Sequence, residues 1–207
     1  MTSSSVIPST AMSRVVETTA VGAAVPRRGN AASRGLSRLL LRLWRWRVVG
    51  QFPDVPKAVL VVAPHTSNWD FLACMLAMFA VGLRLNWIGK HTLFRWPLRP
   101  LLLWLGGIPV RRDSRSGTVA TLVETFRQRE TLLLAIAPEG TRRAVKEWRM
   151  GFAHIAAGAG VPVVPIGLDW THRELVLGPA IPLSGDLDAA ASALRSWFPP
   201  VPGTHLV

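Results

Sequence analysis

The sequence of 207 residues has one cysteine, no tyrosine and only 12 acidic side chains against 24 basic ones. With Cys74 alone, no disulfide can form within the chain and no cysteine-rich zinc site can be built. A charged fraction of 17% beside 49% hydrophobic residues excludes an intrinsically disordered protein. Length and composition together indicate one domain with a substantial hydrophobic core.

A long hydrophobic run is also missing. The longest uncharged apolar stretch, residues 71–83, has 13 residues. As a helix it would extend about 20 Å, against roughly 30 Å for the hydrocarbon core of a bilayer. We therefore expect a buried core helix here and no transmembrane helix. The first 30 residues contain no continuous apolar stretch, which disfavours a secretory signal.

The positive charge is concentrated at the amino end, where residues 1–50 hold eight arginines against the single acid Glu17. A net charge of +12 predicts attraction to polyanions, either a nucleic acid or an anionic lipid surface. Nine tryptophans favour lipid, because Trp prefers the bilayer interface. No nucleic-acid motif is present. We expect an anionic membrane surface as a partner and no nucleic acid.

Residues 1–33 are rich in small and hydroxyl side chains, and we expect a flexible leader; a transit peptide is the alternative. Residues 34–49 predict a basic amphipathic helix. At about 100° per residue, four arginines fall within about 80° of one another and the leucines occupy the opposite arc. Such a helix can lie in the plane of a membrane or dock on the protein's own core with its arginines solvated, and both can hold at once. The arginines are Arg34, Arg38, Arg42 and Arg45, and the leucines are Leu36, Leu39, Leu40 and Leu43.

Residues 50–207 alternate between short apolar runs and segments of helical length. This alternation predicts an α/β domain with a layered sheet, largely parallel or mixed, flanked by helices. The expected strands are 58–63, 85–89, 107–111, 131–137, 161–168 and 174–177, and the expected helices are 69–83, 97–105, 117–129, 151–159 and 187–197.

Function in such a sheet collects in the loops that leave the carboxyl ends of strands. The loop of residues 64–70 places His65 after a strand and Asp70 near a helix start, so the carboxylate could orient the ring as a general base. The alternative needs no catalysis: Ser67 caps the helix and Asp70 completes the capping box. Because the sequence has no G-x-S-x-G elbow and Cys74 lies within an apolar helix, a covalent acyl-enzyme is disfavoured.

Two further loops carry arginines. Arg111 and Arg112 follow one strand, and residues 142–143, both arginine, follow Glu139, Gly140 and Thr141. Arginine forks and small-residue turns suit a phosphate, although no P-loop is present and nucleotide hydrolysis is not indicated. No metal-ligand spacing joins the histidines to acids, so we expect no metal. Trp148, Met150 and Phe152 follow the loop of residues 138–143. They could line an acyl channel or take part in ordinary packing.

These loops occur in an order that resembles the glycerophospholipid acyltransferase family. Four blocks carry the resemblance, which extends over residues 46–178: HTSNWD (65–70), GIPVRR (107–112), PEGTR (138–142) and VPVVP (161–165). The resemblance implies transfer of a fatty acyl group from a thioester, on coenzyme A or acyl-carrier protein, to the hydroxyl of a lysophospholipid. The first candidate acceptor is 1-acyl-glycerol-3-phosphate, and no cofactor is expected. Another lyso-lipid acceptor, such as a lyso-ornithine lipid or a glycolipid, and an inactive basic membrane-binding module remain alternatives.

The resemblance also implies roles for individual residues. His65 matches the general base and Asp70 its orienting carboxylate, while Arg112, Glu139, Gly140, Thr141 and Arg142 match positions that bind the acceptor phosphate. Asn68 and Arg111 are further candidates. At Arg111 many family members carry an acid, which leaves the identity of the acceptor open. The expected location is the cytoplasm, peripherally attached to the inner face of the cell membrane.

Overall fold

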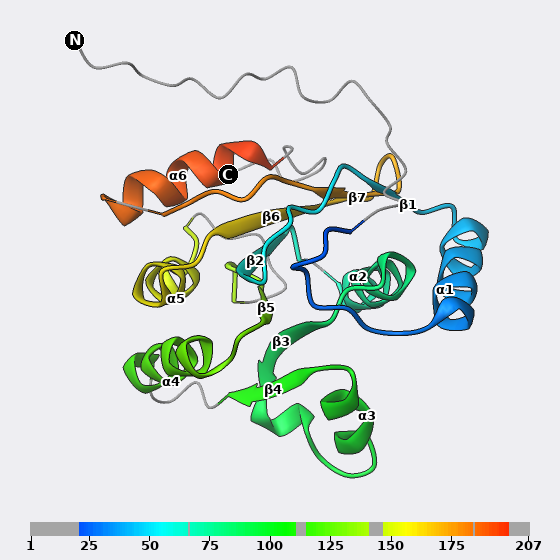
Figure 1. The fold of residues 1–207 in the computed structure, drawn as a ribbon, viewed down its shortest axis with the longest axis horizontal. Helices are drawn as coiled ribbons and strands as arrows, with labels where there is room; N and C mark the ends of the chain where they lie inside the picture. Colours follow the sequence, from blue (N-terminus) through cyan, green and yellow to red (C-terminus); the bar gives the residue numbers. More distant parts are fainter. Residues whose placement is uncertain (1–20, 66, 111–114, 141–146, 184, 199–207) are drawn as a thin grey trace.

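The computed structural model describes residues 21–65, 67–110, 115–140, 147–183 and 185–198. One sheet lies between two groups of helices (Figure 1). All neighbouring strands are parallel except β6 and β7. The predicted α/β class with a largely parallel sheet is therefore confirmed. Across the sheet the strands lie in the order β1 (Arg47–Val49), β7 (Glu174–Leu177), β6 (Val163–Asp169), β2 (Lys57–Ala63), β5 (Leu132–Ile136), β3 (Leu85–Lys90) and β4 (Gly107–Val110).

The helices cover both faces of this sheet. On one side of Figure 1 lie α1 (Ala31–Leu43), α2 (Asn68–Val81) and α3 (Arg99–Trp104), and on the other lie α4 (Arg115–Gln128), α5 (Gly151–Ala159) and α6 (Leu187–Trp197). A single 3₁₀ turn, η1 (His91–Leu93), precedes α3. Successive side chains of β2 alternate between the two faces: Leu60 belongs to the core cluster of α2, and Val59 and Val61 belong to that of α4, α5 and α6. This two-sided burial explains why the strand is apolar throughout.

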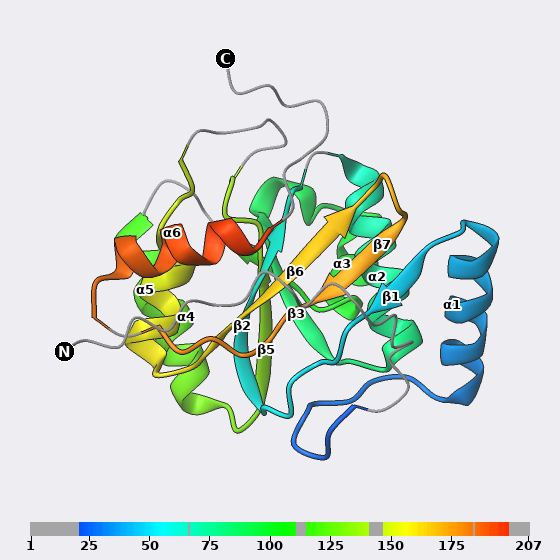
Figure 2. The same ribbon diagram turned by 90° about the horizontal axis from the view of Figure 1, so that it is seen from above.

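The carboxyl ends of three adjacent strands meet at one edge. β5, β2 and β6 are parallel neighbours, and they cross side by side in the view from above (Figure 2). The residues that follow them, beginning at Pro64, Ala137 and Trp170, therefore come together although up to about 100 positions separate them in the sequence. This edge is where we place the candidate site.

The predicted helix at residues 34–49 is wrong in both bounds. Helix α1 begins at Ala31 because Asn30 caps it: the Asn30 side chain accepts from the Ser33 N–H, and the Ser33 hydroxyl accepts from the Asn30 N–H. The helix ends at Leu43, and Arg45 turns the chain with a φ of 62°. Residues 47–49 then form strand β1 beside β7. Periodicity alone could not separate a helix from the short strand that follows it.

The expected flexible leader at residues 1–33 needs a correction in its second half. Val21 and Val25 are buried in the core cluster of α2. The Ala24 N–H donates to the Asp54 carboxylate, 2.9 Å away. Residues 21–33 are thus held against the domain, because two apolar side chains find space beside α2. Residues 1–20 lie outside the described residues.

Helix α1 turns its leucine stripe away from the protein. Ser37 and Leu41 are buried where α1 crosses α2, and Arg38 Nε donates to the Ala80 carbonyl at 3.1 Å. The docked side is therefore narrow and partly polar. The stripe is left exposed, with exposed fractions of 58% for Leu36, 52% for Leu39, 40% for Leu40 and 72% for Leu43. Helix α1 therefore docks on the protein's own core, as one interpretation of the sequence expected, but through Ser37 and Leu41 and not through the four leucines of the stripe.

Within the part of the chain that the structure describes, none of the helices combines the length and hydropathy needed to cross a bilayer.

Candidate active site

His65 stands at the carboxyl end of β2, two residues beyond Ala63. Its side chain is 26% exposed, and its Nδ1 lies 3.5 Å from Asp70 Oδ2. This is an ion-pair distance once the ring is protonated, and catalytic hydrogen bonds are often long before substrate binds. The loop and the start of α2 thus bring together the two residues that the HTSNWD segment predicted.

Asp70 is fully buried, and both of its oxygens have protein partners. Oδ2 accepts from the Ser67 N–H at 2.6 Å and faces the His65 ring. Oδ1 accepts from the Ser67 hydroxyl at 3.1 Å. Ser67 in turn caps α2, so the capping box expected as the non-catalytic alternative is present. The capping box and the His65 contact coexist, because one carboxylate has enough lone pairs for both.

Trp170 adds a contact to Asp70 that the sequence analysis missed. Its indole Nε1–H donates to Asp70 Oδ1 at 2.8 Å. Trp170 follows β6, the strand next to β2. The rule that drew attention to the loops after the other strands applies equally to residues 161–168, and it would have pointed to this position. The large aromatic side chain did not resemble a polar functional residue.

Glu139, which follows β5, is buried, and its side chain contacts the backbone of the His65 loop. Its Oε2 accepts from the His65 backbone N–H at 2.8 Å. Burial raises the pKa of the Glu139 carboxyl, and the hydrogen bond from His65 partly offsets that effect. In the structure the Glu139 side chain contacts the backbone of the His65 loop; the phosphate-binding role expected for it stays a prediction.

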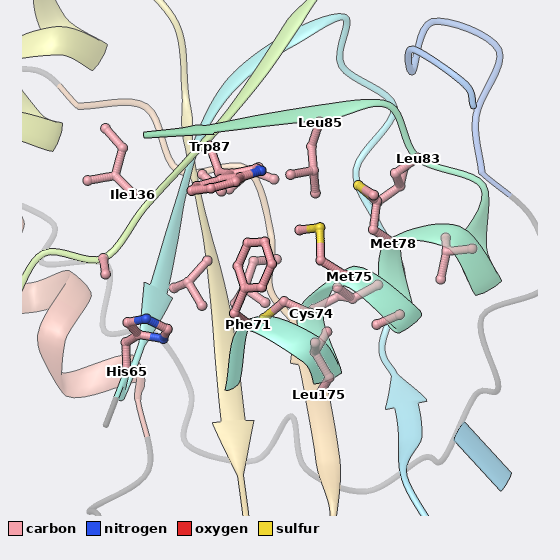
Figure 3. A pocket seen from close by; sticks show the side chains of 18 of the residues that line it. His65, Phe71, Cys74, Met75, Met78, Leu83, Leu85, Trp87, Ile136 and Leu175 are labelled. Atoms are coloured by element: carbon pink, nitrogen blue, oxygen red, sulfur yellow. The ribbon is translucent and has the colours of Figure 1, made fainter. Parts of the chain in front are cut away.

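An apolar cavity of about 130 Å³ extends from His65 between α2 and the sheet. Figure 3 shows His65 at one end, Phe71 and Met75 along the middle, and Met78 with Leu83 at the opposite end. Further side chains come from β2, β3, β5, β6 and β7, and they include Leu60, Val62, Leu85, Trp87, Ile136, Ile166, Leu175 and Leu177. A reactive group held at His65 would thus have a hydrocarbon-like space behind it.

The sequence had left an acyl channel or ordinary packing open for residues 148–152. Phe152 is fully buried on the opposite face of the sheet, and Trp148 contacts it with ring centroids 6.0 Å apart. Met150 packs against the same cluster. These three residues are absent from the lining of the cavity beside His65. The packing interpretation is therefore confirmed.

Cys74 lies on the wall of this cavity but is poorly suited to act as a nucleophile. Burial, with a smaller contribution from the charge of Asp70, raises the pKa of its thiol to about 12. At neutral pH the group is therefore protonated, and the thiolate forms only in strong base. Among the described residues no group of three or more His, Cys, Asp or Glu side chains is close enough to hold a metal ion.

We expect iodoacetamide at about pH 8 to leave Cys74 unmodified in the folded protein and to alkylate it in urea, since only the unfolded chain restores an ordinary thiolate fraction. Mass spectrometry of the intact protein measures both. Alkylation of the folded protein as fast as of the unfolded protein would contradict the raised pKa.

The remaining predicted site residues are Asn68 and Gly140, which the structure describes, and four others that it does not describe. Asn68, the first residue of α2, is exposed. Gly140 follows β5 with a φ of 61°, where a Cβ would meet the Arg149 side chain within 3 Å. Arg111, Arg112, Thr141 and Arg142 lie outside the described residues.

Comparison with known proteins agrees with this picture. The 1-acyl-sn-glycerol-3-phosphate acyltransferase of Escherichia coli is 30% identical over 125 residues, which is 57% of this chain and 49% of that protein. The enzyme of the same name from Haemophilus influenzae is 27% identical over 147 residues, which is 67% of this chain and 60% of that protein. This chain thus spans about half to 60% of the length of these relatives.

The crystal structure of the 1-acyl-sn-glycerophosphate acyltransferase PlsC from Thermotoga maritima has the same fold. It superposes with a TM-score of 0.61 at 17% identity, covering 80% of this chain and 75% of that one. The family model described as Acyltransferase matches residues 46–169, from the turn before β1 to the end of β6. This match includes His65, Asp70 and Glu139 and more than half of the sequence. The chain therefore belongs to the acyltransferase family.

Proposed function

We propose that this chain transfers a fatty acyl group from an acyl thioester to the free hydroxyl of a lysophospholipid. The observation that carries the proposal is the buried Asp70 beside the His65 ring at the mouth of an apolar cavity. A fold alone supports many chemistries, so the proposal depends on this site rather than on the sheet. The names of the relatives make 1-acyl-glycerol-3-phosphate the first candidate acceptor and phosphatidic acid the product.

The proposed step is a direct attack that needs no enzyme-bound intermediate. His65 Nε2 takes the proton of the acceptor hydroxyl, while the Nδ1 side of the ring faces Asp70. The hydroxyl oxygen bonds to the thioester carbonyl carbon, the C–S bond breaks, and the thiolate receives the proton back from the imidazolium. An ester and a free thiol result, so neither a cofactor nor a metal is part of the proposal. General-base catalysis of this kind contributes on the order of 10²–10⁴ in rate.

The charged half of the acceptor is assigned to the loops that follow β4 and β5. Arg111 and Arg112 come directly after Val110, and Arg142 comes two residues after Gly140. Guanidinium groups pair well with phosphate oxygens. Support for this part comes from the motif order and from the position of these strand ends at the edge of the sheet that also carries His65.

The acyl chain is assigned to the cavity beside His65. A thioester carbonyl near the ring would direct its hydrocarbon tail past Phe71 and Met75 towards Met78 and Leu83 (Figure 3). Methionine side chains are flexible enough to move apart for a tail of variable length. The end of the cavity lined by Met78 and Leu83 would then limit the length that fits.

We expect Met78→Trp to shift the preference towards shorter acyl donors, by about tenfold in the ratio of kcat/KM for long and short chains, because the larger ring occupies the end of the cavity. Competition between long- and short-chain acyl-CoA measures the ratio. Met150→Trp is the matched control, since Met150 is absent from the cavity lining, and it should leave the ratio unchanged. An equal shift in both variants would place the tail elsewhere.

Attachment to an anionic membrane surface completes the proposal, at the inner face of the cell membrane where acyl-CoA and acyl-carrier protein are available. In the described parts of the chain, the exposed large apolar side chains all lie in residues 36–43, 69–72 or 93–104. Trp96 is 88% exposed, and Trp104 stacks on Phe79 of α2. Exposed leucine and tryptophan beside arginine is the composition of a lipid-facing surface.

The decisive experiment offers the protein a mixture of lysolipids with isotope-labelled acyl-CoA or acyl-carrier protein and identifies the products by mass spectrometry. Labelled phosphatidic acid supports the proposal, and the two donors compared separately reveal the carrier. Labelled product from a lyso-ornithine lipid or a glycolipid alone would show that this lipid, and not 1-acyl-glycerol-3-phosphate, is the acceptor. No labelled product, together with binding to anionic vesicles, would indicate an inactive binding module.

A further inference from the structure

The indole of Trp170 contacts the carboxylate that orients His65. Asp70 Oδ1 accepts from Trp170 Nε1–H at 2.8 Å, while Oδ2 faces His65 Nδ1 at 3.5 Å. The two residues are 100 positions apart: Trp170 directly follows β6, and Asp70 lies in the first turn of α2. A capping box requires only Ser67 and Asp70, so the indole is not needed to start the helix.

The contact restricts how the carboxylate can turn. A donor fixed on Oδ1 prevents the group from rotating about the Cβ–Cγ bond, and Oδ2 stays directed at the ring. The donor also gives a fully buried polar side chain a hydrogen-bond partner, and burial without such partners would cost free energy. Both effects act on His65 only through Asp70.

Trp170 is itself held by other aromatic rings. Its centroid lies 4.9 Å from that of Trp46, nearly perpendicular, and 6.0 Å from that of Trp44. The Arg173 guanidinium lies 5.5 Å from its ring centroid. Trp44 and Trp46 flank the turn between α1 and β1, so residues on three sides keep the indole in place. A donor held this firmly is suited to position another group.

We propose that Trp170 is a positioning residue for the acyl-transfer reaction, which keeps the Asp70 carboxylate directed at His65. The inference depends on the proposed function, because it gives Asp70 a catalytic task. It differs from a purely structural role in one respect: the indole N–H matters for the rate even where the ring's packing is preserved.

The chain offers a matched control on the opposite face of the sheet. Trp148 lies beside the rings of Phe152 and Phe198, with the Arg195 guanidinium 5.9 Å from its own ring centroid. Replacing Trp148 by Phe therefore removes an indole ring and N–H of the same kind in a cluster that contains neither Asp70 nor His65. Trp170→Phe removes the same atoms together with the hydrogen bond to Asp70.

The test measures kcat and KM for both variants with acyl-CoA and detergent-dispersed 1-acyl-glycerol-3-phosphate. We expect Trp170→Phe to lower kcat on the order of 10- to 100-fold with little change in KM, since a hydrogen bond to a charged group is lost. Trp148→Phe should leave kcat within about twofold of the wild type, since Trp148 packs on the other face of the sheet. An unchanged kcat in Trp170→Phe, or equal losses in both variants, would overturn the proposal.

A double-mutant cycle tests whether Trp170 acts through Asp70. In an Asp70→Asn background, Trp170→Phe should change the residual kcat by less than about twofold, because the orienting charge is already gone. Equal factors in both backgrounds would show independent action and would also overturn the proposal. Absence of transfer by the wild-type protein would instead reject the proposed function, so the two failures are distinguishable.

Discussion

Replacing His65 by alanine should lower kcat by about 10²–10⁴ while the fold and the acceptor KM change little. The imidazole is the group that the geometry places between Asp70 and the cavity mouth. Removing it deletes the proton acceptor but leaves the buried Asp70, the capping box and the cavity walls in place. Initial rates of acyl transfer, with circular dichroism on the same preparations, measure both effects.

His154→Ala is the matched control for this variant. His154 is an exposed residue of α5, on the opposite face of the sheet from the cavity. Its removal should leave kcat within about twofold of the wild type, as for most surface substitutions. A His65→Ala protein that is folded and fully active would eliminate the proposed mechanism.

Replacing the four exposed leucines of α1 by serine should weaken binding to anionic vesicles by about 100-fold or more, because each leucine contributes apolar area that lipid would otherwise cover. The leucines already face solvent in the free protein, so the fold should lose little stability. Sedimentation with vesicles of phosphatidylglycerol and phosphatidylcholine measures the affinity. The positions are Leu36, Leu39, Leu40 and Leu43.

Activity on detergent-dispersed acceptor is the control, and it should remain close to that of the wild type. Replacing Arg34, Arg38, Arg42 and Arg45 by glutamine provides the complementary variant. We expect it to weaken binding to anionic vesicles mainly at low salt, since screening removes the electrostatic part but not the apolar part. Vesicle affinity that stays the same in the leucine variant would mean that α1 does not contact lipid.

The pair of His65 and Asp70 could be predicted because the contact is local. Only four residues lie between them, and a turn between a strand and a helix allows few arrangements. The Ser67 cap could be predicted for the same reason, because its partner Asp70 is only three positions away in the sequence. Alternating apolar runs likewise predicted the layered sheet, since strands buried on both faces must be apolar throughout.

Glu139 and Trp170 show what short-range patterns cannot supply. Glu139 follows β5 and accepts from the His65 N–H, 74 positions away in the sequence. Trp170 follows β6 and donates to Asp70, 100 positions away. Those contacts exist because β2 lies between β5 and β6 in the sheet. Strand order depends on how helices pack over the sheet, and periodicity contains no information about it.

The orientation of α1 has the same origin. Periodicity shows that the helix has a leucine face and an arginine face, but it does not state which one meets the domain. Here α2 accepts the small Ser37 together with Leu41, and the leucine stripe remains exposed. The surface that α2 offers decides which face of α1 docks. The cap at Asn30 decides that the helix begins at Ala31.

By itself, then, the amino-acid order determined most of the elements, the family motifs and the local pair at the start of α2, because these depend on neighbours within one or two turns. The tertiary structure alone decided which side chains from distant strands surround that pair, where the apolar cavity lies and which face of α1 is free. Those features arise when strands far apart in the chain become neighbours, and only the packed sheet fixes that arrangement.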